Sequence, residues 1–499
     1  MSSFNMPPRM LSALSKVEPT QDVTISNVCD DSRNVQPGDA YLCLPRTTTA
    51  AADYIRQAEE AGAKAIITVG HKHPSALPCL HLPNMGAAGD VLRTWFETEN
   101  CDVNSVGVTG TDGKTSIAWM LREALARHLE SAWSVGTLGL VREPSDIEDL
   151  GNTTPSLLSS HRLLGLAKQQ ELDALIMEVS SHGIEQERIA AIPFGVAIWS
   201  NLGHDHLQDH GGFEAYVAIK ERFIVDTVNN GGMAICNADS EIIRQCIRRS
   251  GIDTLWYAHG LYASSADHKI DLTWEQELPG MVRFSYQGNE ICIEDIPAGE
   301  FHAENLAVVA LTLIAHFGVD FKALPSLLKG ISAPPGRMQP LDIGRWQVFI
   351  DYAHTPEALQ RCLETVRTLT RNRLLVVFGC GGERDREKRP DMGAIAVEQA
   401  DLVWITSDNP RGEPPEVIAS EIESGMPKPY PAEVFLELDR QAAIAAAIST
   451  MLPGDAVVIA GKGHEAYMET AGHRSEWSDF GIAADCLHLK EDQRMQLCA

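Results

Sequence analysis

A short glycine-rich segment, Gly107-Val-Thr-Gly-Thr-Asp-Gly-Lys-Thr-Ser116, holds the residues best suited to bind phosphate. An apolar run over 105–108 precedes it, and a helical pattern of apolar residues follows it. Glycines let backbone amides approach phosphate oxygens, and the start of a helix adds partial positive charge. Lys114 would add a full charge, and the hydroxyl of Thr115 could ligate Mg²⁺. The segment predicts a phosphate cradle; the alternative is a tight strand-to-helix turn with a solvated lysine.

Two further apolar runs end in polar side chains. The run 174–177 leads into Glu178, and the run 196–199 leads toward His204-Asp-His206. Ligands of open α/β sheets bind at the carboxyl ends of the strands, so these two ends should meet at one edge. Glu178 could hold Mg²⁺ across from Thr115, or it could be a carboxylate capped by helix amides. The histidines could instead indicate zinc, although no cysteines accompany them.

The elements that must position these residues alternate between strand-like and helical patterns, which predicts an α/β fold with parallel sheets. A chain of 499 residues is long enough for about three domains. The polar stretch 97–102 and the proline-rich stretch 332–340 are the predicted boundaries. The expected domains are therefore 1–101, 102–334 and 335–499. Alternating residues over 271–296 predict an antiparallel excursion inside the middle domain.

Composition excludes several classes of protein. The formal net charge is -27, which repels phosphate backbones and argues against a nucleic-acid-coating protein. The longest apolar runs are far shorter than the ~20 residues that span a bilayer, so no membrane insertion is expected. The first residues lack the pattern of a secretory signal, which predicts a cytoplasmic protein. The 11 cysteines lack CxxC spacing and are expected to be reduced structural thiols.

Eight motifs in order carry a resemblance to a known family. They read GTDGKT, EVSSHG, NLGHDHLQDHG, FHAENLAVVAL, PPGRM, DYAHTPEAL, SDNPRGEPP and AGKGHE. Together they resemble the ATP-dependent Mur ligases, and among them the MurE-type enzymes that add the third residue of the peptidoglycan stem peptide. The resemblance implies a UDP-substrate domain, a central P-loop-like ATPase with a parallel-rich sheet, and a C-terminal Rossmann-like domain that binds the amino acid.

The resemblance also implies a reaction. ATP would phosphorylate the D-Glu γ-carboxylate of UDP-MurNAc-L-Ala-D-Glu, and an amine of meso-diaminopimelate would attack the acyl phosphate to give an amide, ADP and phosphate. The chemistry is consistent, because a carboxylate is a poor electrophile and a phosphate is a good leaving group when cations offset its charge. The expected cofactors are ATP and Mg²⁺.

Residue roles are carried over by motif. The implied catalytic residues are Lys114, Lys220 and His206, and the implied metal ligands are Thr115, Glu178 and His206. The implied nucleotide contacts are Gly110, Thr111, Gly113, Lys114, Thr115, Ser116, Asn305, Arg337 and Asp351. Lys220 stands where the family carries a carbamylated lysine; without the resemblance it would be interpreted as a solvated helical lysine. Carbon dioxide reacts only with a neutral amine, so carbamylation would require burial near cations.

Substrate contacts follow in the same way. UDP-MurNAc-dipeptide contacts are implied for Ser32, Thr153, Thr154, Ser180, Gln186 and Arg188, and amino-acid contacts for Arg384, Asp408, Asn409, Pro410, Arg411, Gly461 and Glu465. Diaminopimelate differs from lysine by one carboxylate, which the planar guanidinium of Arg411 matches. Lysine-adding relatives lack this arginine.

Several positions depart from the family pattern. Asp112 replaces the customary asparagine, Gly203-His204 precedes the Asp-His pair, His302 replaces an asparagine, and Gln339 follows Met338. Two alternatives therefore stay open. One is a related ligase that uses L-lysine or another acceptor, and the other is a nucleotide-binding regulatory protein that transfers no phosphate.

Overall fold

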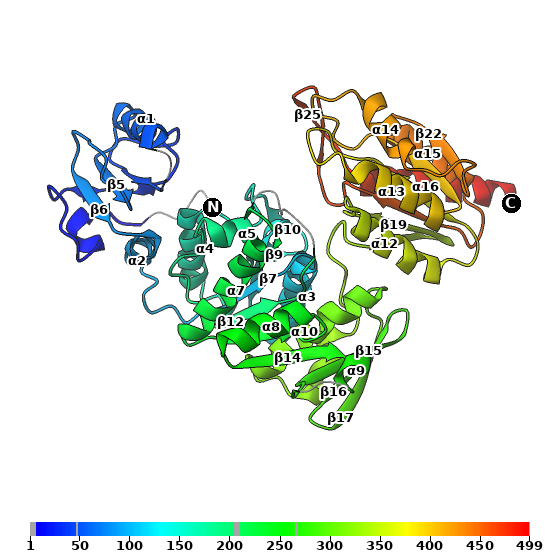
Figure 1. Cartoon of the computed structure of the whole chain (residues 1–499), viewed down its shortest axis with the longest axis horizontal. Coiled ribbons are helices and arrows are strands. Elements are labelled where there is room, and N and C mark those ends of the chain that lie inside the picture. Colours follow the sequence, from blue (N-terminus) through cyan, green and yellow to red (C-terminus); the bar gives the residue numbers. More distant parts are fainter. Residues whose placement is uncertain (1–5, 46–47, 204–209, 265–267, 499) are drawn as a thin grey trace. The chain divides into compact units, whose positions relative to one another are not determined.

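The computed structural model describes residues 6–45, 48–203, 210–264 and 268–498 (Figure 1). The chain forms two compact units. The first comprises Met1–Thr273 and Ala307–Leu327, and the second comprises Trp274–Leu306 and Leu328–Ala499. These limits differ from the predicted domain boundaries at 101 and 334, which stay predictions.

The first unit begins with a small parallel sheet. Its strand order is β3-β4-β5-β6, with β3 at Val28–Cys29, β4 at Ala40–Cys43, β5 at Ala65–Val69 and β6 at Cys79–Leu82. The accompanying elements are β1 (Arg9–Met10), η1 (Leu11–Leu14), β2 (Thr24–Ile25), α1 (Thr48–Glu60) and α2 (Met85–Trp95). Asn84 caps α2 by accepting a hydrogen bond from the Ala87 amide.

Eight strands of an 11-stranded sheet follow in the same unit, in the order β10-β9-β8-β11-β7-β12-β13-β14. Its strands are β7 (Asn104–Thr109), β8 (Ala132–Gly136), β9 (Gly139–Glu143), β10 (Asp146–Glu148), β11 (Ala174–Glu178), β12 (Val196–Trp199), β13 (Met233–Asn237) and β14 (Thr254–His259). The helices are α3 (Lys114–His128), α4 (Leu157–Gln169), α5 (Ser181–Glu185), α7 (Phe213–Asn229), α8 (Glu241–Ser250) and α9 (Gly260–Ala263). Strands β8, β11, β7, β12, β13 and β14 pair in parallel.

Burial explains why these strands form. Every residue of β11 and β12 is buried, as expected of parallel strands covered on both faces. The apolar residues of the helical pattern predicted after the loop, Ile117, Leu121, Ala124 and Leu125, are all fully buried in α3. The predicted strand, glycine turn and helix are therefore confirmed.

The predicted antiparallel excursion is confirmed as β15 (Leu272–Leu278), β16 (Met281–Tyr286) and β17 (Asn289–Glu294), of which β16 and β17 form a hairpin. Most of it lies in the second unit rather than with the first. Helix α10 (Glu300–Ala315) contributes residues to both units, and η2 (Phe321–Ala323) and α11 (Leu324–Leu328) follow it.

The rest of the second unit is a six-stranded sheet in the order β18-β19-β23-β20-β21-β22. The strands are β18 (Gln339–Ile343), β19 (Trp346–Asp351), β20 (Leu374–Phe378), β21 (Leu402–Ile405), β22 (Glu433–Leu436) and β23 (Ala456–Ala460). All pairings except β18·β19 are parallel. The helices are α12 (Pro356–Leu369), α13 (Lys388–Gln399), α14 (Pro415–Ser424), α15 (Arg440–Thr450) and α16 (Asp479–Cys498), and β24 (Tyr467–Thr470) pairs with β25 (His473–Glu476).

Two apolar cores lie on this sheet, because alternate residues of each strand point to opposite faces. Val376 and Val458 belong to one core, and Leu375 and Val457 belong to the other. The chain is thus an α/β protein, as predicted. Searched over the described residues, the chain has no helix with the length and apolar character needed to cross a membrane.

An ion pair at the start of α15 joins two helices to the sheet. Arg440 and Asp479 have fully buried side chains, and Arg440 Nη2 lies 2.6 Å from Asp479 Oδ2. The same guanidinium donates to the carbonyl oxygens of Ala460 at 2.8 Å and Ser407 at 3.2 Å. These carbonyls follow β21 and end β23, so the pair fixes the strand ends that carry the predicted amino-acid site.

We predict that Arg440→Met lowers the free energy of unfolding by about 3–5 kcal/mol, because Asp479 would be left buried without its cation. Urea unfolding followed by circular dichroism measures the change. Arg371→Met, at an exposed position, is the control. The double variant Arg440→Met/Asp479→Leu should lose less stability than Arg440→Met alone; an unfolding midpoint equal to that of the wild type in the single variant would contradict the prediction.

Candidate active site

The glycine-rich segment forms a tight loop between β7 and α3. Gly113 has a φ of +82° at the helix start, a conformation that favours glycine. Lys114 Nζ donates to the carbonyl oxygens of Gly110 at 2.9 Å and Thr111 at 2.7 Å. The ammonium group is therefore held directly over the loop that the sequence predicts to bind phosphate.

A side chain from the neighbouring strand end also shapes this loop. Asn201 Oδ1 accepts hydrogen bonds from the amides of Thr111 at 3.1 Å and Asp112 at 2.8 Å. The Asp112 side chain, which departs from the family pattern, is exposed. Ser116 is buried in the first turn of α3.

Glu178, the last residue of β11, is buried beside the loop. Its Oε2 accepts a hydrogen bond from Thr115 Oγ1 at 3.0 Å. Thr137 donates to the same carboxylate through its amide, at 2.9 Å, and its hydroxyl, at 3.1 Å. Mg²⁺ prefers oxygen ligands and keeps several waters or phosphates, so the Thr115 hydroxyl and the Glu178 carboxylate fit a magnesium site.

His206, the third predicted metal ligand, and the adjoining His204-Asp pair lie outside the described residues. His210 is described and buried. Its Nδ1 lies 3.0 Å from Glu185 Oε2, and its Nε2 lies 2.9 Å from Ser181 Oγ. Among the described residues, no group of three or more histidine, cysteine, aspartate or glutamate side chains is arranged to hold a metal ion.

Lys220 of α7 is buried beside the same loop. Its Nζ donates to the Gly110 carbonyl at 2.8 Å and lies 3.5 Å from Thr109 Oγ1. The Tyr216 ring lies 4.6 Å from the ammonium nitrogen. Lys220 is therefore no solvated helical lysine, and it shares the Gly110 carbonyl with Lys114.

The residues predicted to contact the sugar and diphosphate form a connected group next to Glu178. Thr154 Oγ1 donates to the Glu178 carbonyl at 3.0 Å and lies 3.0 Å from Ser180 Oγ. Arg188 donates to the Thr154 carbonyl at 2.9 Å and to Gln186 Oε1 at 2.8 Å. Thr153 is linked to this group through Thr137, because the hydroxyl oxygens of the two residues lie 3.1 Å apart. Ser32 lies in the small sheet's part of the unit, where it donates to Gln57 at 2.8 Å.

In the second unit, the strand ends of β21 and β23 bring the predicted amino-acid contacts together. Asn409 Nδ2 donates to Glu465 Oε2 at 2.7 Å. Gly461 has a φ of +111°, and a Cβ there would lie 2.6 Å from Asp408 Oδ2, so a larger residue would be strained and would displace this carboxylate. Pro410, which follows Asn409, is also buried. The side chain of Arg384 is instead exposed, near Gly381.

Arg411 is held in place by backbone groups. Its φ is +51°, an uncommon value for a side-chain-bearing residue. Its Nη1 donates to the Gly382 carbonyl at 2.8 Å, and its Nε lies 4.0 Å from Glu469 Oε2. The buried guanidinium of Arg389 supports the neighbouring Gly381 carbonyl at 3.0 Å. The positive-φ conformation thus aims a cation at the end of β21.

The remaining predicted nucleotide contacts also lie in the second unit. Asp351 accepts hydrogen bonds from the amides of Met338 at 2.6 Å and Ala353 at 2.7 Å, and burial raises the pKa of its carboxyl group. Arg337 lies over the Tyr352 ring at 4.5 Å. Asn305 is buried in α10.

His302, one turn before Asn305 in α10, is fully buried. Burial lowers the pKa of its imidazole to about 3, so the ring is neutral. Neither ring nitrogen has a hydrogen-bond partner among the described residues. The structure gives no reason for histidine at this place.

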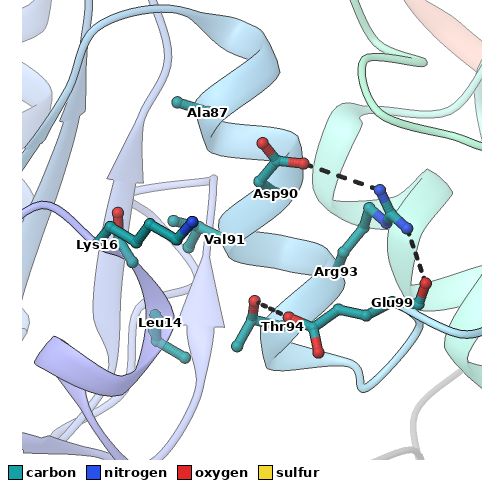
Figure 2. Close-up of a pocket in the computed structure, with 9 residues that line it drawn as sticks. Leu14, Lys16, Ala87, Asp90, Val91, Arg93, Thr94 and Glu99 are labelled. Carbon is teal, nitrogen blue, oxygen red and sulfur yellow. Dashed lines mark hydrogen bonds and ion pairs between the residues drawn. The ribbon is translucent and has the colours of Figure 1, made fainter.

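Figure 2 shows a pocket of about 490 Å³ in the N-terminal part of the first unit. Within it, Arg93 lies 3.9 Å from Asp90 and donates to the backbone carbonyl of Glu99 at 2.9 Å. None of its lining residues is a predicted site residue. The pocket therefore lies apart from the residues described above.

Comparison with known proteins decides the family. The Mur ligase middle domain matches residues 108–313, and the Mur ligase glutamate ligase domain matches residues 336–463. The chain belongs to the Mur ligase family. It is therefore an ATP-dependent amide ligase, the class that the motifs imply.

Two curated relatives of this Mur ligase carry the name UDP-N-acetylmuramoyl-L-alanyl-D-glutamate--2,6-diaminopimelate ligase. The protein of Syntrophomonas wolfei is 34% identical over 94% of this chain and 96% of its own length. The protein of Ectopseudomonas mendocina is 36% identical over 93% of this chain and 95% of its own length.

Solved structures agree with the fold. One with the same name as these relatives is 28% identical, with a TM-score of 0.68 over 97% of this chain and 99% of its own. MurF of Thermotoga maritima in complex with ADP is 18% identical, with a TM-score of 0.60 over 94% of this chain and 98% of its own. At this identity the likeness shows only that the two proteins share a fold.

Sequence reasoning missed three residues of this Mur ligase that contact predicted site residues. Thr137 follows β8, Asn201 follows β12 and Lys462 follows β23, so each stands just after the end of a parallel strand. That position is the signal that could have found them. Lys462 lies in the AGKGHE motif, in which only Gly461 and Glu465 are implied contacts.

Gly136 provides a test of the Glu178 arrangement, because a Cβ there would lie 1.9 Å from Glu178 Oε1. We predict that Gly136→Ala displaces the carboxylate and raises the Mg²⁺ concentration needed for half-maximal ADP release by roughly 10-fold or more. Titration of Mg²⁺ in an ADP-release assay measures this. Gly481→Ala is the control, since its methyl group would meet only Ser478, at 3.4 Å. An unchanged Mg²⁺ requirement in Gly136→Ala would contradict the assignment of Glu178 as a magnesium ligand.

Proposed function

We propose that this Mur ligase joins meso-diaminopimelate to the D-Glu γ-carboxylate of UDP-MurNAc-L-Ala-D-Glu, with ATP converted to ADP and phosphate through an acyl phosphate. The carrying observation is that relatives 34–36% identical over almost the whole chain bear the name of this reaction. The arginine at the end of β21 supports the same acceptor, since its guanidinium can pair with the carboxylate that lysine lacks.

The nucleotide is proposed to bind at the loop between β7 and α3. Lys114 and the loop amides would hold the phosphate oxygens, through Gly110, Thr111, Gly113, Thr115 and Ser116. Thr115, Glu178 and His206 would hold Mg²⁺, which supplies charge neutralisation for phosphoryl transfer. Asn305, Arg337 and Asp351 would complete the nucleotide contacts.

Lys220 is proposed to carry a carbamate, as the family resemblance implies. Burial supports this proposal, because the amine is shielded from bulk water and lies beside the loop that would hold phosphate. Carbamylation would convert the ammonium into an anionic carbamate whose nitrogen keeps one N–H, so the hydrogen bond to the Gly110 carbonyl could be retained.

The two organic substrates are proposed to use separate sets of residues. Thr153, Thr154, Ser180, Gln186 and Arg188 would bind the sugar, diphosphate or dipeptide, with Ser32 at the uridine. The acceptor would be bound by Arg384, Asp408, Asn409, Pro410, Arg411, Gly461 and Glu465. Domains at 1–101, 102–334 and 335–499 and a cytoplasmic location are part of this proposal.

The acceptor can be tested directly. Purified protein with UDP-MurNAc-L-Ala-D-Glu and ATP should release ADP with meso-diaminopimelate at a kcat/KM roughly 10²–10⁴-fold above that with L-lysine, because a partly buried arginine without its carboxylate partner is costly. Arg411→Met should lose most of this preference by raising the KM for diaminopimelate. The measurement is coupled ADP release with each acceptor.

Arg371→Met serves as the matched control, since Arg371 is exposed. Faster turnover with L-lysine by the wild type would overturn the proposed acceptor. An unchanged preference in Arg411→Met would remove Arg411 from its proposed role while leaving the reaction itself in place.

A further inference from the structure

The second unit buries a lysine to which neither the resemblance nor the proposed function gives a role. Lys462 follows β23, and its side chain is fully buried. A buried ammonium group needs hydrogen bonds or a counter-charge. Its Nζ lies 2.9 Å from Asn409 Oδ1 and 3.3 Å from Glu465 Oε2. The cation therefore contacts two residues of the proposed acceptor site.

The contact with Asn409 fixes which end of that amide faces Glu465. Asn409 Oδ1 accepts hydrogen bonds from Lys462 and from the Glu469 amide, the latter at 2.9 Å. Both partners are donors only, so this atom must be the oxygen. The Nδ2 group is consequently left to donate to Glu465 Oε2 at 2.7 Å.

Glu465 is thereby held through one of its oxygens. Lys462 and Asn409 both donate to Oε2, and no described residue donates a hydrogen bond to Oε1. The side chain keeps 17% of its surface exposed. One carboxylate oxygen is therefore fixed and the other is available to a ligand cation.

The charges around Glu465 explain why a cation is needed at Lys462. Burial is the main cause that raises the pKa of the Glu465 carboxyl, and Asp408 raises it further, whereas Lys462 and Asn409 lower it. The ionisable groups that face Glu465 are Lys462, Asp408, Tyr352, Tyr467 and Arg440. Lys462 offsets one of the two neighbouring carboxylates, so the turn can still attract a positive group.

We propose that Lys462 is a positioning residue of the acceptor site, which fixes the Glu465 carboxylate directly and through Asn409 so that Oε1 binds an ammonium group of the incoming diamino acid. This inference rests on the proposed function. It assigns the recognition of an ammonium group of diaminopimelate to Glu465 positioned by Lys462, whereas Arg411 recognises a carboxylate of the same substrate.

The test compares Lys462→Met with the wild type in steady-state ADP release. The KM for meso-diaminopimelate should rise roughly 10–100-fold at pH 7, as for other residues that orient a binding group, while the KM values for ATP and the UDP-substrate stay within about twofold. Without Lys462 the pKa of Glu465 is higher, so more of the carboxyl is protonated at low pH. The ratio of variant to wild-type KM should therefore fall as the pH rises from 6.5 to 9.

A double-mutant cycle separates positioning from mere structural support. In a Glu465→Gln background, Lys462→Met should change the KM for diaminopimelate by less than about twofold, because its target is gone. Lys428→Met, an exposed lysine of the same unit, is the control. If Lys462→Met does not fold, Lys462→Gln keeps a donor for Asn409 and should show the same pH trend.

Three results would overturn the inference: an unchanged KM for diaminopimelate, an equal rise of all three KM values, or a full effect of Lys462→Met in the Glu465→Gln background. Each requires an active wild type. A wild type that does not turn over with diaminopimelate would instead overturn the proposed function, and the inference with it.

Discussion

The parallel pairing of β11 with β7 is the constraint on which the nucleotide site depends. It sets Glu178 opposite Val108, just before the glycine-rich loop begins. That register brings the carboxylate within hydrogen-bonding distance of Thr115, which is 63 residues earlier in the chain. A shift of one residue would turn the side chain to the opposite face of the sheet, where neither Thr115 nor Thr137 could reach it.

Cations at both groups of strand ends are held in a common way. Lys114, Arg188 and Arg411 each donate to backbone carbonyl oxygens. A carbonyl dipole orients a cation and leaves its full charge in place. This arrangement lets a chain with a net charge of -27 present local positive charge to anionic ligands.

The sequence predicted the features that depend on local pattern. The apolar runs before Thr111, Glu178 and Ser200 are strands β7, β11 and β12, and the helix after Gly113 buries its predicted apolar residues. Thr137 and Asn201 were missed because their roles depend on which strands are neighbours, and this order does not follow the chain. The limits of the compact units also depend on long-range contacts, which explains why they differ from the limits drawn at polar stretches.

One carbonyl oxygen, that of Gly110, accepts hydrogen bonds from both Lys114 and Lys220. The positions of the two amines therefore both depend on the orientation of the peptide group that contains the Gly110 carbonyl. Rotation of that plane would weaken one hydrogen bond of each amine, and Lys114 would keep its bond to the Thr111 carbonyl. Lys114 and Lys220 are far apart in the chain, yet a change at the Gly110 carbonyl would affect both.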